Sequence, residues 1–134
     1  MPGTEEKLDL LLHYGEFIYG MDGRPEKAIA PFHEAVDLAS KLYPTLMGSD
    51  RLANAHDWLG RCYLLSGKRK ESELHFQKAL EVRIGLYGED HSEVAQSWHC
   101  MGNAAAAFGR YELAKELHLK ALDMKKRHLG ENHV

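Results

Sequence analysis

Histidine is the residue type that offers this chain the most chemistry. Nine of the 134 residues are histidines and two are cysteines. Two of the histidines close nearly identical tetrapeptides, GEDH at 88–91 and GENH at 130–133. An imidazole beside acidic or amide groups, present twice, suggests a duplicated metal site or a duplicated acid–base site.

The spacing of the histidines argues against such a site. Two metal ligands on one helical face need a spacing such as that in H-E-x-x-H, and the sequence contains neither this motif nor HxxxH or CxxC. His13, His56 and His99 recur at regular intervals and are expected to line one surface, without carboxylate or thiolate partners at ligand spacing. We therefore predict no metal, no cofactor and no catalytic residue, and the chain is not expected to be an enzyme.

The two cysteines, Cys62 and Cys100, are also poor candidates for chemistry. They lie far apart among helix-forming residues, and neither falls in a loop that would activate it beside a histidine. They form no disulfide framework, which favours a reducing compartment. The acidic start MPGTEEKLDL lacks the features of a secretory signal, and no apolar run approaches the roughly 20 residues of a membrane span. These observations predict a cytoplasmic location.

The charge of the chain gives no support for a nucleic-acid or membrane partner. The net charge is −3, and the basic residues form only two short runs, at 68–70 and 125–127. The second run is expected near the C-terminus of a helix, where cations interact favourably with the helix dipole. The sequence has no glycine-rich phosphate-binding motif. The sequence therefore predicts neither a nucleic-acid partner nor a membrane partner.

The elements that position these residues are predicted to be helices arranged in three copies of one unit. All four prolines precede residue 45, and alanine, leucine, glutamate and lysine are common. Residues 50–92 align with 92–134 without a gap, and an earlier copy aligns at an offset of 44 residues. The identities fall mostly on small or turn residues, and they include Ala53/Ala95, Gly60/Gly102, Gly67/Gly109, Ala79/Ala121, Leu80/Leu122, Gly88/Gly130 and His91/His133 in the later copies, with Tyr19/Tyr63, Gly23/Gly67 and Phe32/Phe76 in the earlier one.

Each unit has the pattern of two antiparallel helices. In the second unit, apolar residues recur at helical spacing over 52–66 and again over 69–86. Gly23, Gly67 and Gly109 separate the two patterns, where a tight turn needs positive φ. The short connection requires the two helices to be neighbours. Gly60 and Gly102 fall in mid-helix, which predicts that another helix approaches closely there.

These residues resemble the tetratricopeptide repeat. The resemblance rests on Leu59, Gly60, Tyr63, Gly67, Phe76 and Ala79 in unit two, on Trp98, Met101, Gly102, Gly109, Ala114 and Ala121 in unit three, and on Tyr19, Gly23, Ala28, Phe32 and Ala35 in unit one. The 42-residue spacing, with LYGEDHSEVA between units, is similar to the long repeats of kinesin light chains. The resemblance implies an all-α fold, a right-handed α-solenoid of three antiparallel helix pairs. One domain over 1–134 would hold repeats at about 5–43, 50–87 and 92–129.

Some positions depart from the family pattern. Gly15-Glu16 stands where Leu-Gly is expected, so the first helix is predicted to pack irregularly. Ser72 takes a small-alanine position and Ala105 replaces the expected tyrosine. His56 and His118 occupy aromatic positions, and His118 is expected to be a packing residue.

The resemblance implies a function in protein binding. The first helix of each pair would line a concave groove that holds a peptide or a partner's helix. Arg61 would engage a carboxylate, and the Asn103 amide would both donate to and accept from a peptide backbone. The chain is thus predicted to be a non-catalytic interaction module or scaffold; the alternatives are a regulatory arm of a larger multidomain enzyme or signalling protein, or a self-associating structural repeat. The groove-facing candidates are His13, Phe17, Asn54, Asp57, Arg61, Gln96, His99 and Asn103.

The two tetrapeptides are best explained as joints between helices. Asp90 and Glu93 have the spacing of a capping box, and Gly88 is expected to end the preceding helix. In the second copy, Asn132 takes the capping position where the first helix of a fourth unit would begin. We therefore expect the chain to be part of a longer array or to self-associate through its C-terminal helix pair.

Overall fold

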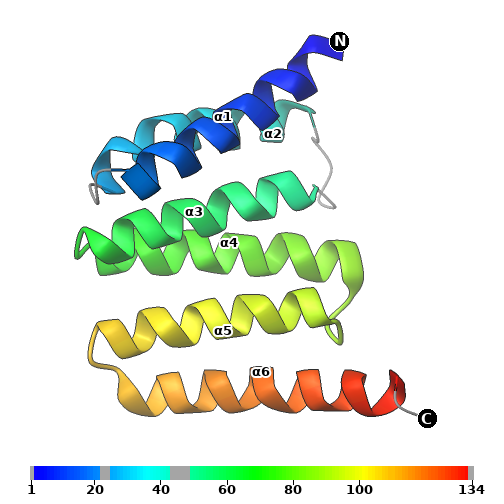
Figure 1. Cartoon of the computed structure of the whole chain (residues 1–134). Coiled ribbons are helices and arrows are strands. Elements are labelled where there is room, and N and C mark those ends of the chain that lie inside the picture. Colours follow the sequence, from blue (N-terminus) through cyan, green and yellow to red (C-terminus); the bar gives the residue numbers. More distant parts are fainter. Residues whose placement is uncertain (1, 22–24, 43–48, 133–134) are drawn as a thin grey trace.

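The chain folds into a stack of α-helices that run alternately in opposite directions (Figure 1). The computed structural model describes residues 2–21, 25–42 and 49–132, with side chains described for 5–20, 25–42 and 49–128. In these ranges there is no strand. The elements are α1 (Pro2–Met21), the short 3-10 turn η1 (Pro25–Lys27), α2 (Ile29–Leu42), α3 (Asp50–Leu65), α4 (Arg69–Tyr87), α5 (Ser92–Ala107) and α6 (Tyr111–Asn132).

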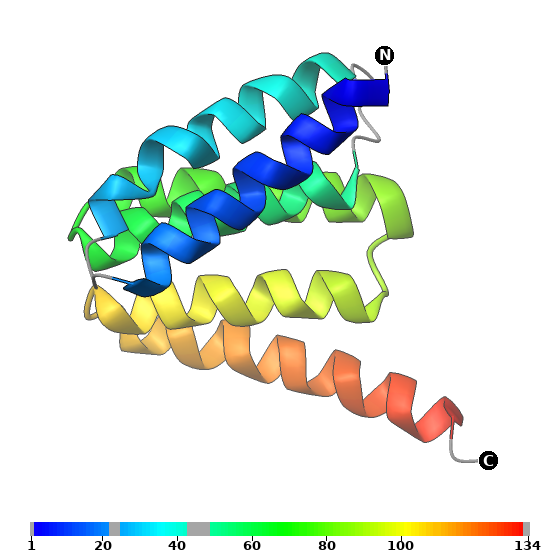
Figure 2. The ribbon, with the colours of Figure 1, turned by 45° about the horizontal axis from the view of Figure 1, so that its top comes forward.

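The helices form pairs that stack one on the next, as Figures 1 and 2 show. The pairs are α1 with α2, α3 with α4, and α5 with α6, and they are joined by packing of α2 on α3 and of α4 on α5. In the described residues no Cα atom of α2, α4 or α6 comes within 8 Å of another of these second helices, whereas α3 comes that close to both α1 and α5. This arrangement confirms the predicted all-α solenoid.

The turns within pairs follow the glycine prediction. Gly67 has φ 76° and Gly109 has φ 80°, a region that favours glycine. In each turn the next residue donates its backbone N–H across the turn, from Lys68 to the Tyr63 carbonyl and from Arg110 to the Ala105 carbonyl, both at 2.8 Å. Gly23, the corresponding residue of the first pair, lies outside the described residues.

The joint between α4 and α5 differs from the predicted capping box. Gly88, with φ 83°, ends α4 as expected, but the residue that caps α5 is His91 rather than Asp90. The Nδ1 atom of His91 accepts a hydrogen bond from the Glu93 backbone N–H at 3.0 Å. The Asp90 carboxylate instead meets α6, with Oδ2 3.5 Å from Arg127 Nη1 and Oδ1 3.3 Å from His128 Nε2. An imidazole nitrogen can therefore replace the usual oxygen acceptor at this cap.

The second tetrapeptide is not a copy of this joint. Helix α6 continues through Gly130 and Glu131 and ends at Asn132, the residue that was predicted to cap a following helix. His133 lies outside the described residues. Gly130 can lie inside the helix because its neighbours, Leu129 and Glu131, are good helix formers.

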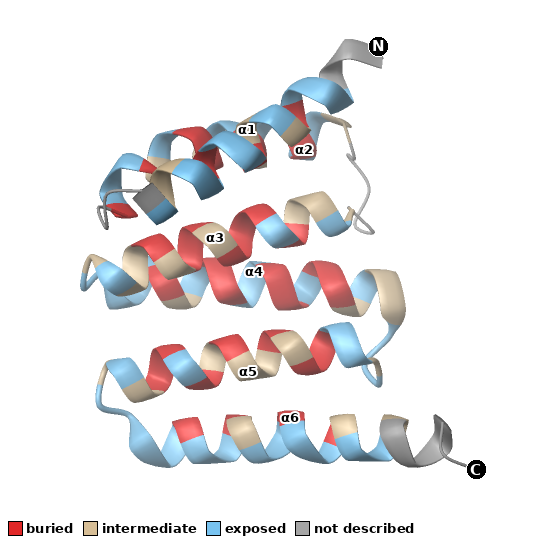
Figure 3. Cartoon of the chain, viewed as in Figure 1, coloured by how far each residue is buried: buried red, intermediate tan, exposed pale blue. Residues whose placement is uncertain are grey.

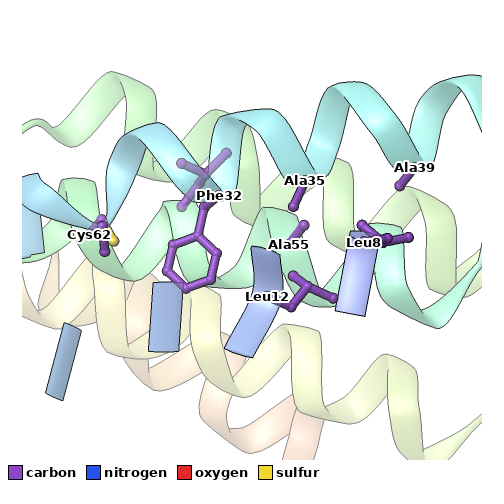
Figure 4. Close-up of a cluster of buried hydrophobic side chains, with 9 residues drawn as sticks. Leu8, Leu12, Phe32, Ala35, Ala39, Ala55 and Cys62 are labelled. Atoms are coloured by element: carbon purple, nitrogen blue, oxygen red, sulfur yellow. The ribbon is translucent and has the colours of Figure 1, made fainter. Parts of the chain in front are cut away.

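The core lies between the helix layers and is richest around α2 and α3 (Figure 3). The buried side chains of this cluster come from three helices (Figure 4). They include Leu8 and Leu12 of α1, Phe32, Ala35 and Ala39 of α2, and Ala55 and Cys62 of α3. The Phe32 ring stacks on Trp58 of α3, with ring centroids 5.5 Å apart and planes only 6° from parallel. This packing fixes the first two helix pairs against each other.

One glycine in each pair allows an aromatic ring to touch a helix backbone. A Cβ atom added to Gly60 would lie 2.8 Å from the Phe76 ring, and one added to Gly102 would lie 2.9 Å from the His118 ring. This confirms the predicted close approach and the packing role of His118. Gly15 meets Phe32 in the same way, at 2.6 Å, so the prediction of irregular packing in the first pair is wrong. One more residue separates Gly15 from Phe32 than separates Gly60 from Phe76, which moves α1 by one position relative to the 44-residue alignment.

Candidate functional site

The histidines whose side chains are described do not form a metal-binding group. In the ranges where side chains are described, no group of three or more histidine, cysteine or acidic side chains could hold a metal ion. His13 and His99 lie at accessible positions of α1 and α5, but His56 is buried, so the prediction that these three line one surface is wrong.

His56 instead belongs to a ring cluster formed with His33, Tyr63 and His75. The Nδ1 atoms of His56 and His75 are 3.0 Å apart, and Nε2 of His33 is 2.9 Å from the Tyr63 hydroxyl oxygen. Burial, reinforced by neighbouring histidines and Lys78, lowers the pKa of His56 to about 3 and that of His75 to about 4. Both imidazoles are therefore neutral at pH 7, and the cluster packs α2, α3 and α4 together.

The two cysteines are buried thiols. Both are free. Burial raises the pKa of Cys62 to about 12, and burial followed by the Asp57 charge raises the pKa of Cys100. Both thiols are therefore protonated at neutral pH.

A buried ion pair joins α3 and α4. Arg83 of α4 and Asp57 of α3 are joined by a contact of 2.6 Å between Nη2 and Oδ2, and both side chains are more than nine-tenths buried. Arg83 also donates to Ser97 Oγ at 2.7 Å and to Asn54 Oδ1 at 3.2 Å. One guanidinium thus connects three successive helices and sets the spacing of α3 and α5.

This network corrects the prediction for Asp57. The side chain was expected in the groove, but it points into the helix packing, and burial raises its pKa although Arg83 opposes that shift. Its Oδ1 atom is buried without a hydrogen-bond partner. Asn54 is exposed as predicted, but its carbonyl oxygen is engaged by Arg83. The sequence carried one signal for this network, because Arg83 is an arginine among the mainly apolar residues of the buried face of α4.

Four other predicted residues share one pocket. Arg61 of α3 and Gln96, His99 and Asn103 of α5 line a space of about 270 Å³, and its remaining lining residues are Leu64, Phe76 and Cys100. We call this the groove pocket. These three residues could not be recognised as pocket residues from the sequence, because they also belong to the core pattern.

The groove pocket has a cationic character. The Arg61 guanidinium lies 4.8 Å from the centre of the Trp58 ring, which holds it over α3. The His99 ring packs edge to face on His118 at 5.0 Å, and burial, with His118 and Lys125 nearby, lowers the pKa of His99. A fixed guanidinium beside a neutral imidazole and two amides suits an anionic group attached to a hydrogen-bonding backbone.

The two predicted residues on α1 lie elsewhere. His13 and Phe17 are exposed and do not line the groove pocket. Phe17, 62% exposed, follows Leu10 and Tyr14 along one face of α1. The structure therefore separates the α1 candidates from those on α3 and α5.

Comparison with known proteins identifies the architecture. A family model described as tetratricopeptide repeat matches residues 51–127, more than half of the chain. The crystal structure of the TPR domain of Arabidopsis FLU superposes with a TM-score of 0.76 at 18% identity, covering 92% of this chain and 98% of that chain. At that identity the likeness concerns the fold. A search of curated proteins gave no significant match. None of the helices in the described ranges is long and apolar enough to cross a membrane.

Proposed function

Because the chain belongs to the tetratricopeptide repeat family, we propose that it is a non-catalytic interaction module whose groove pocket binds a peptide with an acidic group. The observation that carries this proposal is the shared pocket of Arg61, Gln96, His99 and Asn103. The narrower resemblance to the long repeats of kinesin light chains stays a prediction.

The chemistry of the pocket supports an acidic ligand. Arg61 is held by the Trp58 ring, so little side-chain freedom is lost when the guanidinium pairs with a carboxylate. The exposed Asn103 amide offers a donor and an acceptor to a peptide backbone. The protonated thiol of Cys100 and the neutral His99 do not compete for the carboxylate or provide a nucleophile.

Peptides selected from a displayed random library on the wild-type chain should lose affinity for the variant Arg61→Glu/Asn103→Ala by at least tenfold, or about 1.4 kcal/mol. The reason is a reversed charge and a lost amide at the centre of the pocket. Titration calorimetry measures the affinity, and the melting temperature is expected to stay within a few degrees because neither side chain is buried.

The matched control is Lys41→Glu, which makes the same kind of charge reversal at an exposed position on α2. It should leave affinity within about twofold. Equal losses in the two variants, or selected peptides that bind Arg61→Glu/Asn103→Ala as well as wild type, would place the binding surface outside the groove pocket.

We propose a second partner, another copy of the chain, because the helices at both ends of the stack expose apolar side chains. Leu10, Tyr14 and Phe17 of α1 are 69%, 58% and 62% exposed. When Gly15 is aligned with Gly60, these three residues correspond to Ala55, Leu59 and Cys62 of α3. Those three counterparts are fully buried against α2. Likewise Leu122 of α6 is 48% exposed, whereas its counterpart Leu80 is 3% exposed because it packs on α5. Head-to-tail contact of α6 with α1 of a second copy would cover both faces.

Light scattering over a concentration series should then show a mass that rises above the monomer. Tyr14→Glu/Leu122→Glu should shift this rise to at least tenfold higher concentration, since both faces would carry a charge. Leu65→Glu, at a 61% exposed position outside both faces, is the control and should leave the curve unchanged. A monomer at every concentration would contradict the proposal.

A further inference from the structure

A second pocket, which shares only Phe76 with the groove pocket, opens between α4 and α6. It encloses about 410 Å³. Met101, Ala104 and Ala105 of α5 form its floor, and Leu74 of α4 with Leu113 and Leu117 of α6 forms much of its walls. An ion pair of 2.9 Å between Arg110 Nη1 and Glu73 Oε1 crosses its rim. We call it the α4–α6 pocket.

The preceding pair of helices shows what fills the equivalent space. Between α2 and α4 the position of Ala105 is taken by Tyr63, whose ring stacks on His75 with centroids 5.6 Å apart and planes 12° from parallel. The Tyr63 hydroxyl is 2.9 Å from Nε2 of His33. A tyrosine ring with one hydrogen bond thus fills the space between α2 and α4.

The counterparts of all three residues line the open pocket. In the alignment of the units, Tyr63 corresponds to Ala105, His75 to Leu117 and His33 to Gln77. Ala105, Leu117 and Gln77 are all lining residues of the α4–α6 pocket. The space is therefore the place of a tyrosine ring that this unit lacks, and a hydrogen-bonding side chain remains where the hydroxyl would point.

We propose that the α4–α6 pocket binds an aromatic side chain of the tyrosine type, presented by a partner protein. The ring occupies the apolar space over Ala105 and contacts Met101 and Leu117. The Gln77 amide pairs with the hydroxyl, as His33 does with Tyr63. This site goes beyond the proposed function, since it faces between the second helices and uses neither Arg61 nor Asn103.

The probe for this site is p-cresol, the side chain of tyrosine as a free molecule. Titrated into the wild-type chain, it should shift the NMR signals of Ala105 and Leu117 with a dissociation constant on the order of millimolar, as expected for a ligand of about eight heavy atoms. Ala105→Tyr supplies the ring from within the chain, as Tyr63 does between α2 and α4. This variant should weaken p-cresol binding at least tenfold.

Two further variants make the result decisive. Ala107→Tyr adds the same ring to an exposed position of α5 and should leave p-cresol binding unchanged. Gln77→Ala, at an exposed position of α4, should weaken p-cresol about fivefold and leave toluene binding unchanged, because only p-cresol has the hydroxyl. This variant decides the question even if Ala105→Tyr does not fold.

Three results would overturn the proposal. The first is an absence of shifts at Ala105 and Leu117 at tens of millimolar p-cresol. The second is undiminished binding to a folded Ala105→Tyr variant. The third is equal behaviour of p-cresol and toluene towards Gln77→Ala. None of these readouts involves a peptide in the groove pocket, so they leave the proposed function to its own test.

Discussion

Arg83→Ala is expected to lower the free energy of unfolding by about 3–5 kcal/mol, because it leaves the Asp57 carboxylate buried without a counter-ion. The Oδ1 atom of Asp57 already lacks a hydrogen-bond partner, so no second donor is in place to compensate. Asn54 and Ser97 lose their bonds to the guanidinium at the same time. Urea unfolding followed by circular dichroism at neutral pH measures the loss.

Two comparisons isolate the buried pair. Arg127→Ala removes an arginine from exposed contacts with Asp90 and Asp123 and should cost no more than about 1 kcal/mol. The double variant Asp57→Leu/Arg83→Met removes both buried charges and should recover most of the stability lost in Arg83→Ala. If Arg83→Ala costs no more than Arg127→Ala, the pair is not the tie between α3, α4 and α5 that the structure indicates.

Acidification from pH 6.5 to pH 5 is expected to destabilise the fold by about 2 kcal/mol through His56 alone. Burial lowers the pKa of His56 from 6.5 to about 3 in the folded chain, so in this window the unfolded chain binds a proton that the folded chain does not. The stabilisation is complete above pH 6.5 and decreases as the pH falls towards 3. His75, with a pKa of about 4, adds a loss of the same sign.

The measurement is the free energy of unfolding in urea at several pH values between 7 and 4.5. The variant His56→Gln/His75→Gln should have a shallower slope in this range, because neither side chain can take up a proton on unfolding. His13→Gln, at an exposed position of α1, should keep the wild-type slope. A wild-type slope in the double variant would mean that other groups control the acid sensitivity.

The helix pairs and their close contacts can be predicted from the sequence because small residues leave few alternatives. Gly67 and Gly109 mark turns that need positive φ, and Gly60 and Gly102 mark backbones touched by a ring. The one-residue shift of α1 was missed because the extra residue between Gly15 and Phe32 changes no residue pattern within either helix.

The buried polar groups were harder to predict. Asn54, Asp57 and Arg61 are three or four residues apart, so helical spacing alone places all of them on one face. The structure turns Asp57 towards α4 because Arg83 lies opposite. The positive charge of Arg83 on the buried face of α4 predicts a buried acidic partner. The helical periodicity does not show which acidic residue of the neighbouring helices is that partner.

The candidate site could be predicted only in part from the sequence. Arg61, Gln96, His99 and Asn103 follow from the regular alternation of first helices, and the structure brings them to one pocket. The α4–α6 pocket does not follow from a pattern of present residues. It arises from the absence of a ring at Ala105, and its size became visible only once the neighbouring helices were in place.

The most direct test of the central claim, that the groove pocket is the binding surface, is an NMR map of the chain with a selected acidic peptide bound. The largest shifts are expected at Arg61, Gln96, His99 and Asn103, with no shift at the exposed residues of α2. Shifts confined to α1, α2 or α6, with those four signals unmoved at saturation, would contradict the claim.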